Sequence, residues 1–182
     1  MLAWMDLEMT GLDPAFDVIV EIAIIVTDDD LAVIAEAPPL VIHATDAQLD
    51  AMVPVVTEMH AASGLTEAIR ASTTTIEQAA ERTLAFLAAH VPKGEIPLCG
   101  NSIGTDRRFL QVHLPEVEAW FHYRNVDVST LKELLKRWRP EVLASSPEKP
   151  TNHRALDDIR ASIEELRHYR AALFTPPAVV PT

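Results

Sequence analysis

Two acidic residues, Asp6 and Glu8, interrupt an otherwise apolar stretch close to the start of the chain. Residues i and i+2 of a strand point to the same face, so a strand here holds Asp6 and Glu8 side by side. Two partly dry anions repel each other and raise their own pKa values unless a positive group lies between them. The first 69 residues contain no Lys or Arg to supply that charge. Oxygen ligands of this kind suit Mg²⁺ or Mn²⁺; a pair of solvated acids at a strand end is the alternative.

A third acid, Asp106, follows the polar turn at residues 100–105, between a predicted strand and a predicted helix. Residues of such connecting turns often face a site rather than the core. An Asp near the start of a helix is also a common N-cap, which is the alternative interpretation of Asp106.

A histidine and a fourth acid lie near the C-terminus, where His153 precedes Asp158 by five residues. Asp158 lies between Leu156 and Ile159, two positions of the apolar stripe of the last predicted helix, so we expect it beside the buried face. Five residues on a continuous helix leave side chains about 140° apart. His153 and Asp158 can therefore converge only if His153 lies on the loop before the helix. A solvated or capping histidine is the alternative.

The elements that must position these residues follow from the apolar pattern, which predicts strands at 2–8, 17–27 and 31–43. Short turns between these strands indicate an antiparallel meander, with an interruption of the third strand at Pro38-Pro39. Helices and strands then alternate, which predicts an α/β fold with a mixed sheet flanked by helices. We expect helices at 45–52, 55–63, 75–90, 106–113, 131–138 and 153–174, strands at 96–100 and 120–128, a loop at 140–150, and packing of the 131–138 helix through Leu131, Leu134, Leu135 and Trp138.

The composition is that of a globular protein, with 182 residues of which 48% are hydrophobic and 23% charged. This length predicts a single domain over residues 1–174, followed by a Pro-rich tail at 175–182 that we expect to be disordered. A single cysteine, Cys99, excludes a disulfide framework and a cysteine-based zinc site. Because the chain has no signal-peptide pattern and no apolar run of membrane-spanning length, we expect a soluble, cytoplasmic protein without a membrane partner.

The charge is unevenly distributed along the chain. The net charge is −12, and the first 69 residues carry thirteen of the 27 Asp and Glu residues but none of the fifteen Lys and Arg residues. Such a surface is poorly suited to long nucleic acids, whose binding depends on neutralising phosphates. A phosphate-bearing substrate should therefore be short.

Taken together, these motifs resemble those of the DEDD family of 3′–5′ exonucleases in its His-containing branch. Three longer stretches are similar to the oligoribonuclease family: Trp-x-Asp-Leu-Glu-Met-Thr-Gly-Leu-Asp at 4–13, Cys-Gly-Asn-Ser-Ile-Gly-x-Asp-Arg-Arg-Phe-Leu at 99–110, and Phe-His-Tyr-Arg-x-x-Asp-Val-Ser-Thr-Leu-Lys-Glu-Leu at 121–134. The resemblance covers residues 2–174, and no acid or histidine of the motifs is missing.

This resemblance implies a ribonuclease H-like fold and two divalent cations, Mg²⁺ or Mn²⁺, in each active site. Asp6 would bridge the two ions, Glu8 and Asp158 would complete one site, and Asp106 would support the other. His153 would deprotonate the attacking water, a task suited to an imidazole whose pKa lies near neutrality. The product would be a 5′-mononucleotide released from the 3′ end.

The resemblance also implies a substrate of very short RNA, notably dinucleotides, and a homodimeric enzyme. Leu12 and His60 match the family residues that contact the bases; otherwise Leu12 is a turn residue and His60 a solvated helix residue. The 5′ phosphate would be held by Ser102, Ser129, Thr130 and, from the partner subunit, Arg124.

Two other functions are compatible with the same motifs. A DNA-directed proofreading exonuclease would share the five catalytic residues but leave the 5′ side of the cleft open, which the stretch at 121–134 argues against. A non-catalytic nucleic-acid-binding domain would typically have lost at least one metal ligand, and all four acids are present.

Overall fold

A computed structural model describes residues 1–147 and 153–174 of the chain. In that part, six strands form one sheet of order β3-β2-β1-β5-β6, with β4 also paired to β2. β1 is antiparallel to β2, which is antiparallel to β3 and β4, whereas β5 runs parallel to both β1 and β6. The strands are β1 (Leu2–Met9), β2 (Ile19–Thr27), β3 (Val33–Glu36), β4 (Leu40–Val41), β5 (Pro97–Gly100) and β6 (His122–Asp127).

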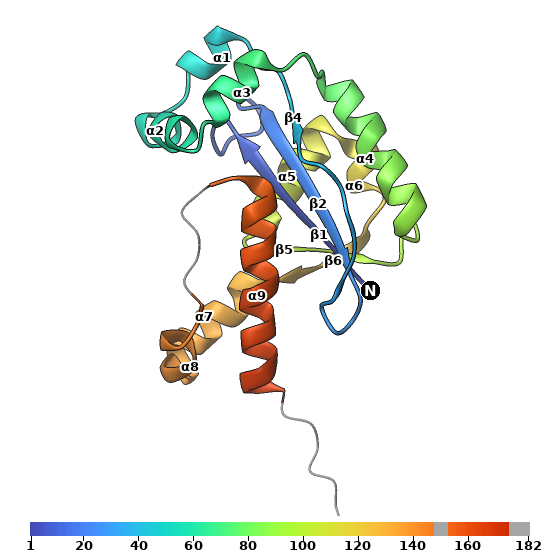
Figure 1. Cartoon of the computed structure of the whole chain (residues 1–182), viewed down its shortest axis with the longest axis vertical. Helices are drawn as coiled ribbons and strands as arrows, with labels where there is room; N and C mark the ends of the chain where they lie inside the picture. Colours follow the sequence, from blue (N-terminus) through green and yellow to red (C-terminus); the bar gives the residue numbers. More distant parts are fainter. Residues whose placement is uncertain (148–152, 175–182) are drawn as a thin grey trace, which may run out of the picture.

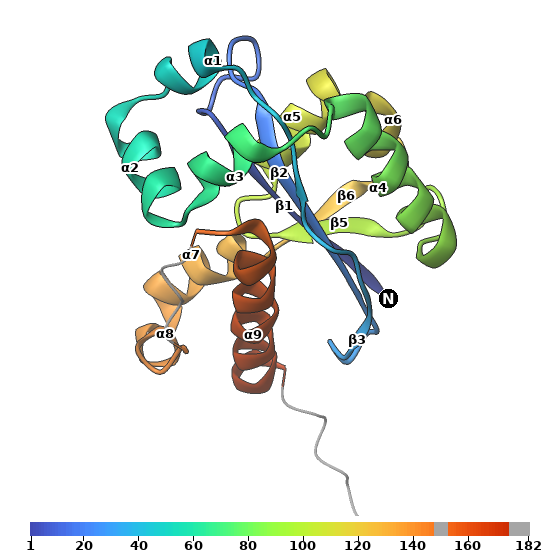
Figure 2. The same ribbon diagram turned by 45° about the horizontal axis from the view of Figure 1, so that its top comes forward.

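Helices cover both faces of the sheet (Figures 1 and 2). Figure 2 shows α4, α5 and α6 on one side of the strands and α7 and α9 on the other. The short helices α1, α2 and α3 lie together near the end of β1 (Figure 1). The helices are α1 (Asp46–Asp50), α2 (Pro54–Ala62), α3 (Leu65–Ala71), α4 (Ile76–His90), α5 (Gly104–His113), α6 (Pro115–Glu118), α7 (Val128–Trp138), α8 (Pro140–Ala144) and α9 (Ala155–Leu173).

The two faces of β1 contribute to different cores. Met5 and Leu7 pack in a cluster with residues of α4, α5 and α6, including Phe109. Trp4 packs in a second cluster that includes Ile159 of α9. Because side chains alternate along a strand, Asp6 and Glu8 leave β1 on the same side as Trp4, toward α9.

The predicted mixed α/β sheet and its antiparallel meander are confirmed. Pro38 and Pro39 separate two short strands, β3 and β4, where the sequence predicts one interrupted strand. Three short helices, α3, α6 and α8, were not predicted, and α8 lies within the expected loop at 140–150. Both α6 and α8 carry a proline in their first turn, a position that tolerates proline. In a sequence, however, proline also indicates a loop.

The prediction that Trp138 packs against the core is wrong. Trp138 is the last residue of α7, and its side chain is 69% exposed, whereas Leu135 one turn earlier is buried. The last helix begins at Ala155 rather than at His153, so His153 lies on the preceding loop. Residues 148–150 of the expected loop and the tail at 175–182 lie outside the described residues.

Within the described ranges, no helix is both long and apolar enough to cross a lipid bilayer.

Candidate active site

Three carboxylates from two elements converge on one side of the sheet. Asp6 and Glu8 project from β1, Asp158 projects from the first turn of α9, and each offers an oxygen within 4.8 Å of the others. Glu8 is buried, while Asp6 and Asp158 are partly exposed. The structure therefore brings together three of the four acids that the sequence singles out, and leaves them open to solvent on one side.

The fourth acid, Asp106, is buried in the first turn of α5. Pairing between β1 and β5 extends to Trp4 and Cys99. Further along β1, an Asp106 carboxylate oxygen accepts the Leu7 N–H at 3.0 Å. This contact holds Asp106 against the strand that carries Asp6. The N-cap interpretation of Asp106 is wrong, because α5 begins at Gly104 with Ile103 at its N-cap.

Burial and mutual repulsion keep this cluster from ionising fully. Burial raises the pKa of Asp6 well above its usual value, and the charges of Asp106 and Glu8 raise it further. Burial, followed by the charges of Asp158 and Glu21, raises the pKa of Glu8 to about 8. Burial also raises the pKa of Asp106 to about 7, against the opposing effect of the Leu7 N–H. A donor set of several such oxygens around one point fits a divalent cation, whose charge would release the retained protons.

Arg154, which is 133 residues from Glu21 in the chain, brings a cation to this region that the local sequence does not predict. Its guanidinium donates to the buried carboxylate of Glu21 through Nε at 3.1 Å and Nη2 at 2.5 Å. Glu21 lies directly opposite Glu8 in the β1–β2 ladder. Arg154 thus neutralises Glu21. It also lowers the pKa of Glu8, but this effect is smaller than each of those that raise that pKa.

Glu21 also fixes the start of α9. The Ala155 N–H, one of the free donors of the first helical turn, donates to Glu21 Oε2 at 3.1 Å. The N-cap residue Arg154 makes no side-chain hydrogen bond to the first turn of α9, so Glu21 of β2 caps the helix instead. A lone acid within the apolar run of β2 was the one sequence signal for this contact, since a buried carboxylate needs a partner.

The two histidines predicted to belong to the site, His153 and His60, lie in different environments. His153 is exposed on the loop before α9, with φ of 44° in the left-handed region. His60 is 0% exposed, so its interpretation as a solvated residue is wrong. Its Nε2 lies 2.9 Å from the Met9 carbonyl oxygen, and its Nδ1 lies 3.9 Å from Glu8 Oε2. Burial lowers the pKa of His60, and the carbonyl contact requires the proton on Nε2.

The remaining predicted binding residues lie on the surface. Leu12 is 71% exposed on the turn after β1. Ser102 lies on the turn after β5, and its N–H lies 3.3 Å from the hydroxyl oxygen of Ser129 at the start of α7. Arg124 and Thr130 are both exposed. The structure therefore brings Ser102 and Ser129 together.

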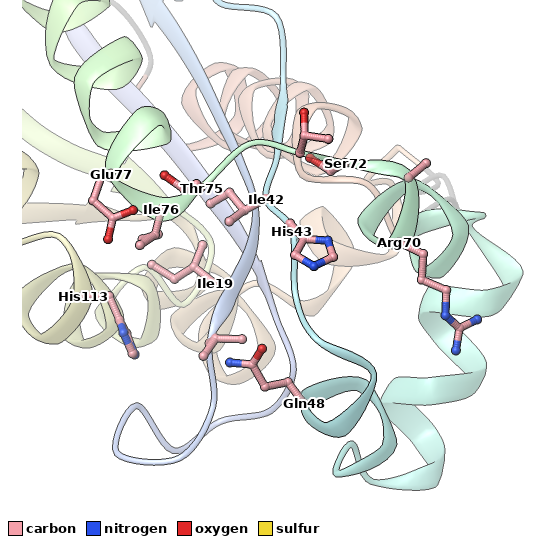
Figure 3. Close-up of a pocket in the computed structure, with 13 residues that line it drawn as sticks. Ile19, Ile42, His43, Gln48, Arg70, Ser72, Thr75, Ile76, Glu77 and His113 are labelled. Carbon is pink, nitrogen blue, oxygen red and sulfur yellow. The ribbon is translucent and has the colours of Figure 1, made fainter.

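A separate cavity of about 590 Å³ lies between the segment after β4, the helices α1 and α3, the start of α4 and the end of α5 (Figure 3). Its apolar lining includes Ile19 and Ile42, which belong to the core cluster of Met5 and Leu7. The cavity is therefore on the sheet face opposite the acidic cluster, and none of the four predicted acids lines it.

The mixed sheet with helices on both faces is the ribonuclease H-like fold. A family model described as "Exonuclease" matches residues 3–166. The chain belongs to the oligoribonuclease family. It is 56% identical to the oligoribonuclease of Halorhodospira halophila over 177 residues, which are 97% of this chain and 96% of that protein. It is likewise 56% identical to the oligoribonuclease of Vibrio vulnificus over 173 residues, 95% of each protein.

Solved structures of exonuclease I share the fold. The zinc-bound complex of E. coli exonuclease I with single-stranded DNA has a TM-score of 0.73 at 18% identity, over 94% of this chain and 40% of that chain. Exonuclease I of Methylocaldum szegediense has a TM-score of 0.65 at 22% identity, over 96% and 41%. The present chain thus spans about 40% of the length of the exonuclease I chains.

Arg154→Met should lower the free energy of unfolding by about 3 kcal/mol, because it leaves the Glu21 carboxylate buried without its partner. This value is at the low end for a broken buried pair, since 30% of the Arg154 side chain is exposed. Urea denaturation measures the change. The matched control is Arg160→Met on the same helix, which removes an exposed ion pair with Glu36 and should cost less than about 1 kcal/mol. Equal losses of unfolding free energy in the two variants would show that the Glu21–Arg154 pair stabilises the fold no more than an exposed ion pair does.

Proposed function

We propose that this chain is a metal-dependent 3′–5′ exoribonuclease that hydrolyses very short RNA, notably dinucleotides, to 5′-mononucleotides. The convergence of Asp6, Glu8 and Asp158, with Asp106 buried beside them, is the observation that carries the proposal. Membership of the oligoribonuclease family supports the choice of RNA, since its relatives in H. halophila and V. vulnificus bear that name.

Divalent cations, Mg²⁺ or Mn²⁺, would be held by the four acids: Asp6, Glu8 and Asp158 around one ion, and Asp6 with Asp106 around a second. When bound, two such ions stabilise the charge that develops on the attacking and leaving oxygens of a phosphoryl displacement. The raised pKa values of Glu8 and Asp106 support this assignment, because protein groups alone leave the cluster partly protonated.

His153 is the proposed general base. Its imidazole is exposed on the loop before α9, where a ring nitrogen can accept the proton of a water molecule. Its loop is tied down by the neighbouring residue, because Arg154 is paired with Glu21. His153 precedes the N-terminus of α9, and Asp158 lies in the first turn of that helix. The second predicted histidine, His60, is buried and donates to the Met9 carbonyl oxygen, so its proposed role at the bases is to support the end of β1, from which the turn with Leu12 continues.

The proposed preference for short substrates follows from charge and from the proposed 5′-phosphate pocket. With no Lys or Arg among the first 69 residues and a net charge of −12, the chain is poorly suited to bind a long phosphate backbone. Affinity would instead come from the metal site, from Leu12 at the bases, and from Ser102, Ser129 and Thr130 at the terminal phosphate. Arg124 would join them from the partner of a homodimer. It is exposed on β6, which ends the described sheet order and so presents a strand edge to a second copy.

A DNA-directed 3′–5′ exonuclease is the second candidate, because the solved exonuclease I structures include complexes with single-stranded DNA. Those chains are more than twice as long and only 18% identical to this one. A comparison of ribo- and deoxyribodinucleotides, each beside a longer strand of the same sugar, separates the two functions. We expect the ribodinucleotide to be hydrolysed faster than the deoxyribodinucleotide and faster than the longer strands. Faster hydrolysis of the longer DNA strand than of the ribodinucleotide would favour the second candidate.

His153→Ala should lower kcat on an RNA dinucleotide by about 10²–10⁴, the usual contribution of a general base, with little change in KM. Single-turnover hydrolysis of a 5′-labelled dinucleotide with Mn²⁺ measures the effect, and EDTA should abolish the activity of the parent enzyme. His90→Ala, at the exposed end of α4, is the control and should retain full activity. A His153→Ala enzyme with a raised KM and an unchanged kcat would make His153 a substrate-holding residue instead.

Arg124→Ala should weaken the binding of a 5′-phosphorylated dinucleotide by about 1.5–3 kcal/mol, the range for hydrogen bonds to charged groups. The loss should be much smaller for the same dinucleotide without its 5′ phosphate. Mixing Arg124→Ala with Asp6→Ala subunits should restore part of the activity, because one site of each heterodimer then carries both intact residues. Equal losses on the two substrates and no recovery on mixing would rule out a contribution from the partner subunit.

A further inference from the structure

A carboxylate lies at the centre of the proposed 5′-phosphate pocket. Asp127 is the last residue of β6 and the N-cap of α7. Its Oδ1 accepts three hydrogen bonds: from the Ser102 N–H at 2.9 Å, the Ser129 N–H at 3.0 Å and the Ser129 hydroxyl at 2.6 Å. A negative group is an unexpected neighbour for a phosphate, so its contacts call for a role other than direct binding.

The contacts of Asp127 fix two segments that are 25 residues apart in the chain. Ser102 has φ of 54°, a left-handed conformation that residues other than glycine rarely adopt. The bond from its N–H to Asp127 holds that turn in place. The same oxygen accepts the Ser129 N–H, one of the free donors in the first turn of α7, which fixes the helix start and with it Ser129. One acceptor thus sets the relative position of Ser102 and Ser129.

The turn that contains Ser102 is also anchored to α9. The side-chain amide of Asn101 donates to the hydroxyl oxygen of Ser162 at 2.7 Å and to Glu165 Oε2 at 3.1 Å. Both partners are buried residues of α9. Asn101 therefore anchors the turn to the helix that carries Asp158, while Asp127 orients its exposed end.

We propose that Asp127 is a positioning residue that aims Ser102 and Ser129 at the 5′ phosphate of the substrate. This inference rests on the proposed function, since it requires a substrate with a phosphate in this pocket. The Ser129 hydroxyl has a single proton, which it gives to Asp127 in this structure. To donate to a phosphate, the hydroxyl must turn, and Asp127 then keeps its two N–H contacts. Asp127 acts through the two serines.

The position and the charge of Asp127 have opposite effects on phosphate binding, and two substitutions separate them. Asp127→Ala removes the common acceptor and frees both segments. Asp127→Asn keeps an acceptor oxygen for the two N–H groups but removes the negative charge. Burial is the main reason for the raised pKa of Asp106, and the charge of Asp127 adds to it, so the pocket adjoins the acidic cluster.

The experiment measures kcat and KM of the full-length Asp127→Ala and Asp127→Asn enzymes on one RNA dinucleotide with and without a 5′ phosphate. Asp127→Ala should raise KM for the phosphorylated substrate by about tenfold or more, the equivalent of one hydrogen bond to a charged group. Its KM for the unphosphorylated substrate should change much less. Asp127→Asn should bind the phosphorylated substrate at least as well as the parent. The control Thr75→Ala removes an N-cap from α4, remote from the pocket, and should affect both substrates equally.

A purely structural role for Asp127 predicts a different pattern. Equal losses on both substrates in Asp127→Ala, as in Thr75→Ala, would overturn the inference. So would an Asp127→Asn enzyme that loses the phosphate preference as completely as Asp127→Ala. A parent enzyme that hydrolyses dinucleotides without any preference for a 5′ phosphate would overturn the pocket itself and this inference with it. A parent enzyme inactive on RNA dinucleotides would instead refute the proposed function.

Discussion

Asp6 and Glu8 leave β1 on the same face, and the geometry of a strand gives them no way to separate. The fold adds to their repulsion, because α9 brings Asp158 to within 4.8 Å and α5 brings Asp106 against the same strand. In water such a group of carboxylates would disperse. Here it is held by the apolar cluster that includes Trp4 of β1 and Ile159 of α9, and by the Leu7 N–H. The cluster is thus an unfavourable charge arrangement maintained by an apolar core.

The basic side chain that reaches this region, Arg154, leaves most of the negative charge of the cluster in place. Arg154 pairs with Glu21, a buried acid outside the cluster, and so offsets mainly that acid, with only the smallest of the influences on the pKa of Glu8. The same pair fixes the start of α9 through the Ala155 N–H. One interaction therefore removes a surplus negative charge and orients the helix that carries Asp158. In the proposed function, the remaining carboxylates attract a divalent cation.

The sequence alone predicted the parts of this site that depend on local periodicity. The two-residue repeat of a strand placed Asp6 beside Glu8, and the apolar stripe of the last helix placed Asp158 at the buried face. The Glu21–Arg154 pair could not be predicted, because its members are 133 residues apart and only tertiary packing brings them together. The burial of His60 was missed for the same reason. The proline-initiated helices α6 and α8 were missed because four- and five-residue helices depend on packing more than on their own propensity. The roles of the site residues remain proposals.

The central claim is that the carboxylates retain protons until a divalent cation replaces them. The pKa of Glu8 is raised from 4.5 to about 8 and that of Asp106 from 3.8 to about 7, so the folded protein binds protons that the unfolded chain has released. This contribution to stability is fully present below the unfolded pKa values and is lost as the pH rises through about 7 to 8.

Thermal unfolding at about pH 6 and about pH 8.5, in EDTA and in Mn²⁺, tests this most directly. The account predicts a lower Tm at the higher pH in EDTA, a rise in Tm with Mn²⁺ that is larger at the higher pH, and a weaker dependence on both in Asp6→Asn. Two results together would contradict the account: a Tm in EDTA that changes equally with pH in the parent and in Asp6→Asn, and a parent Tm that does not change when Mn²⁺ is added.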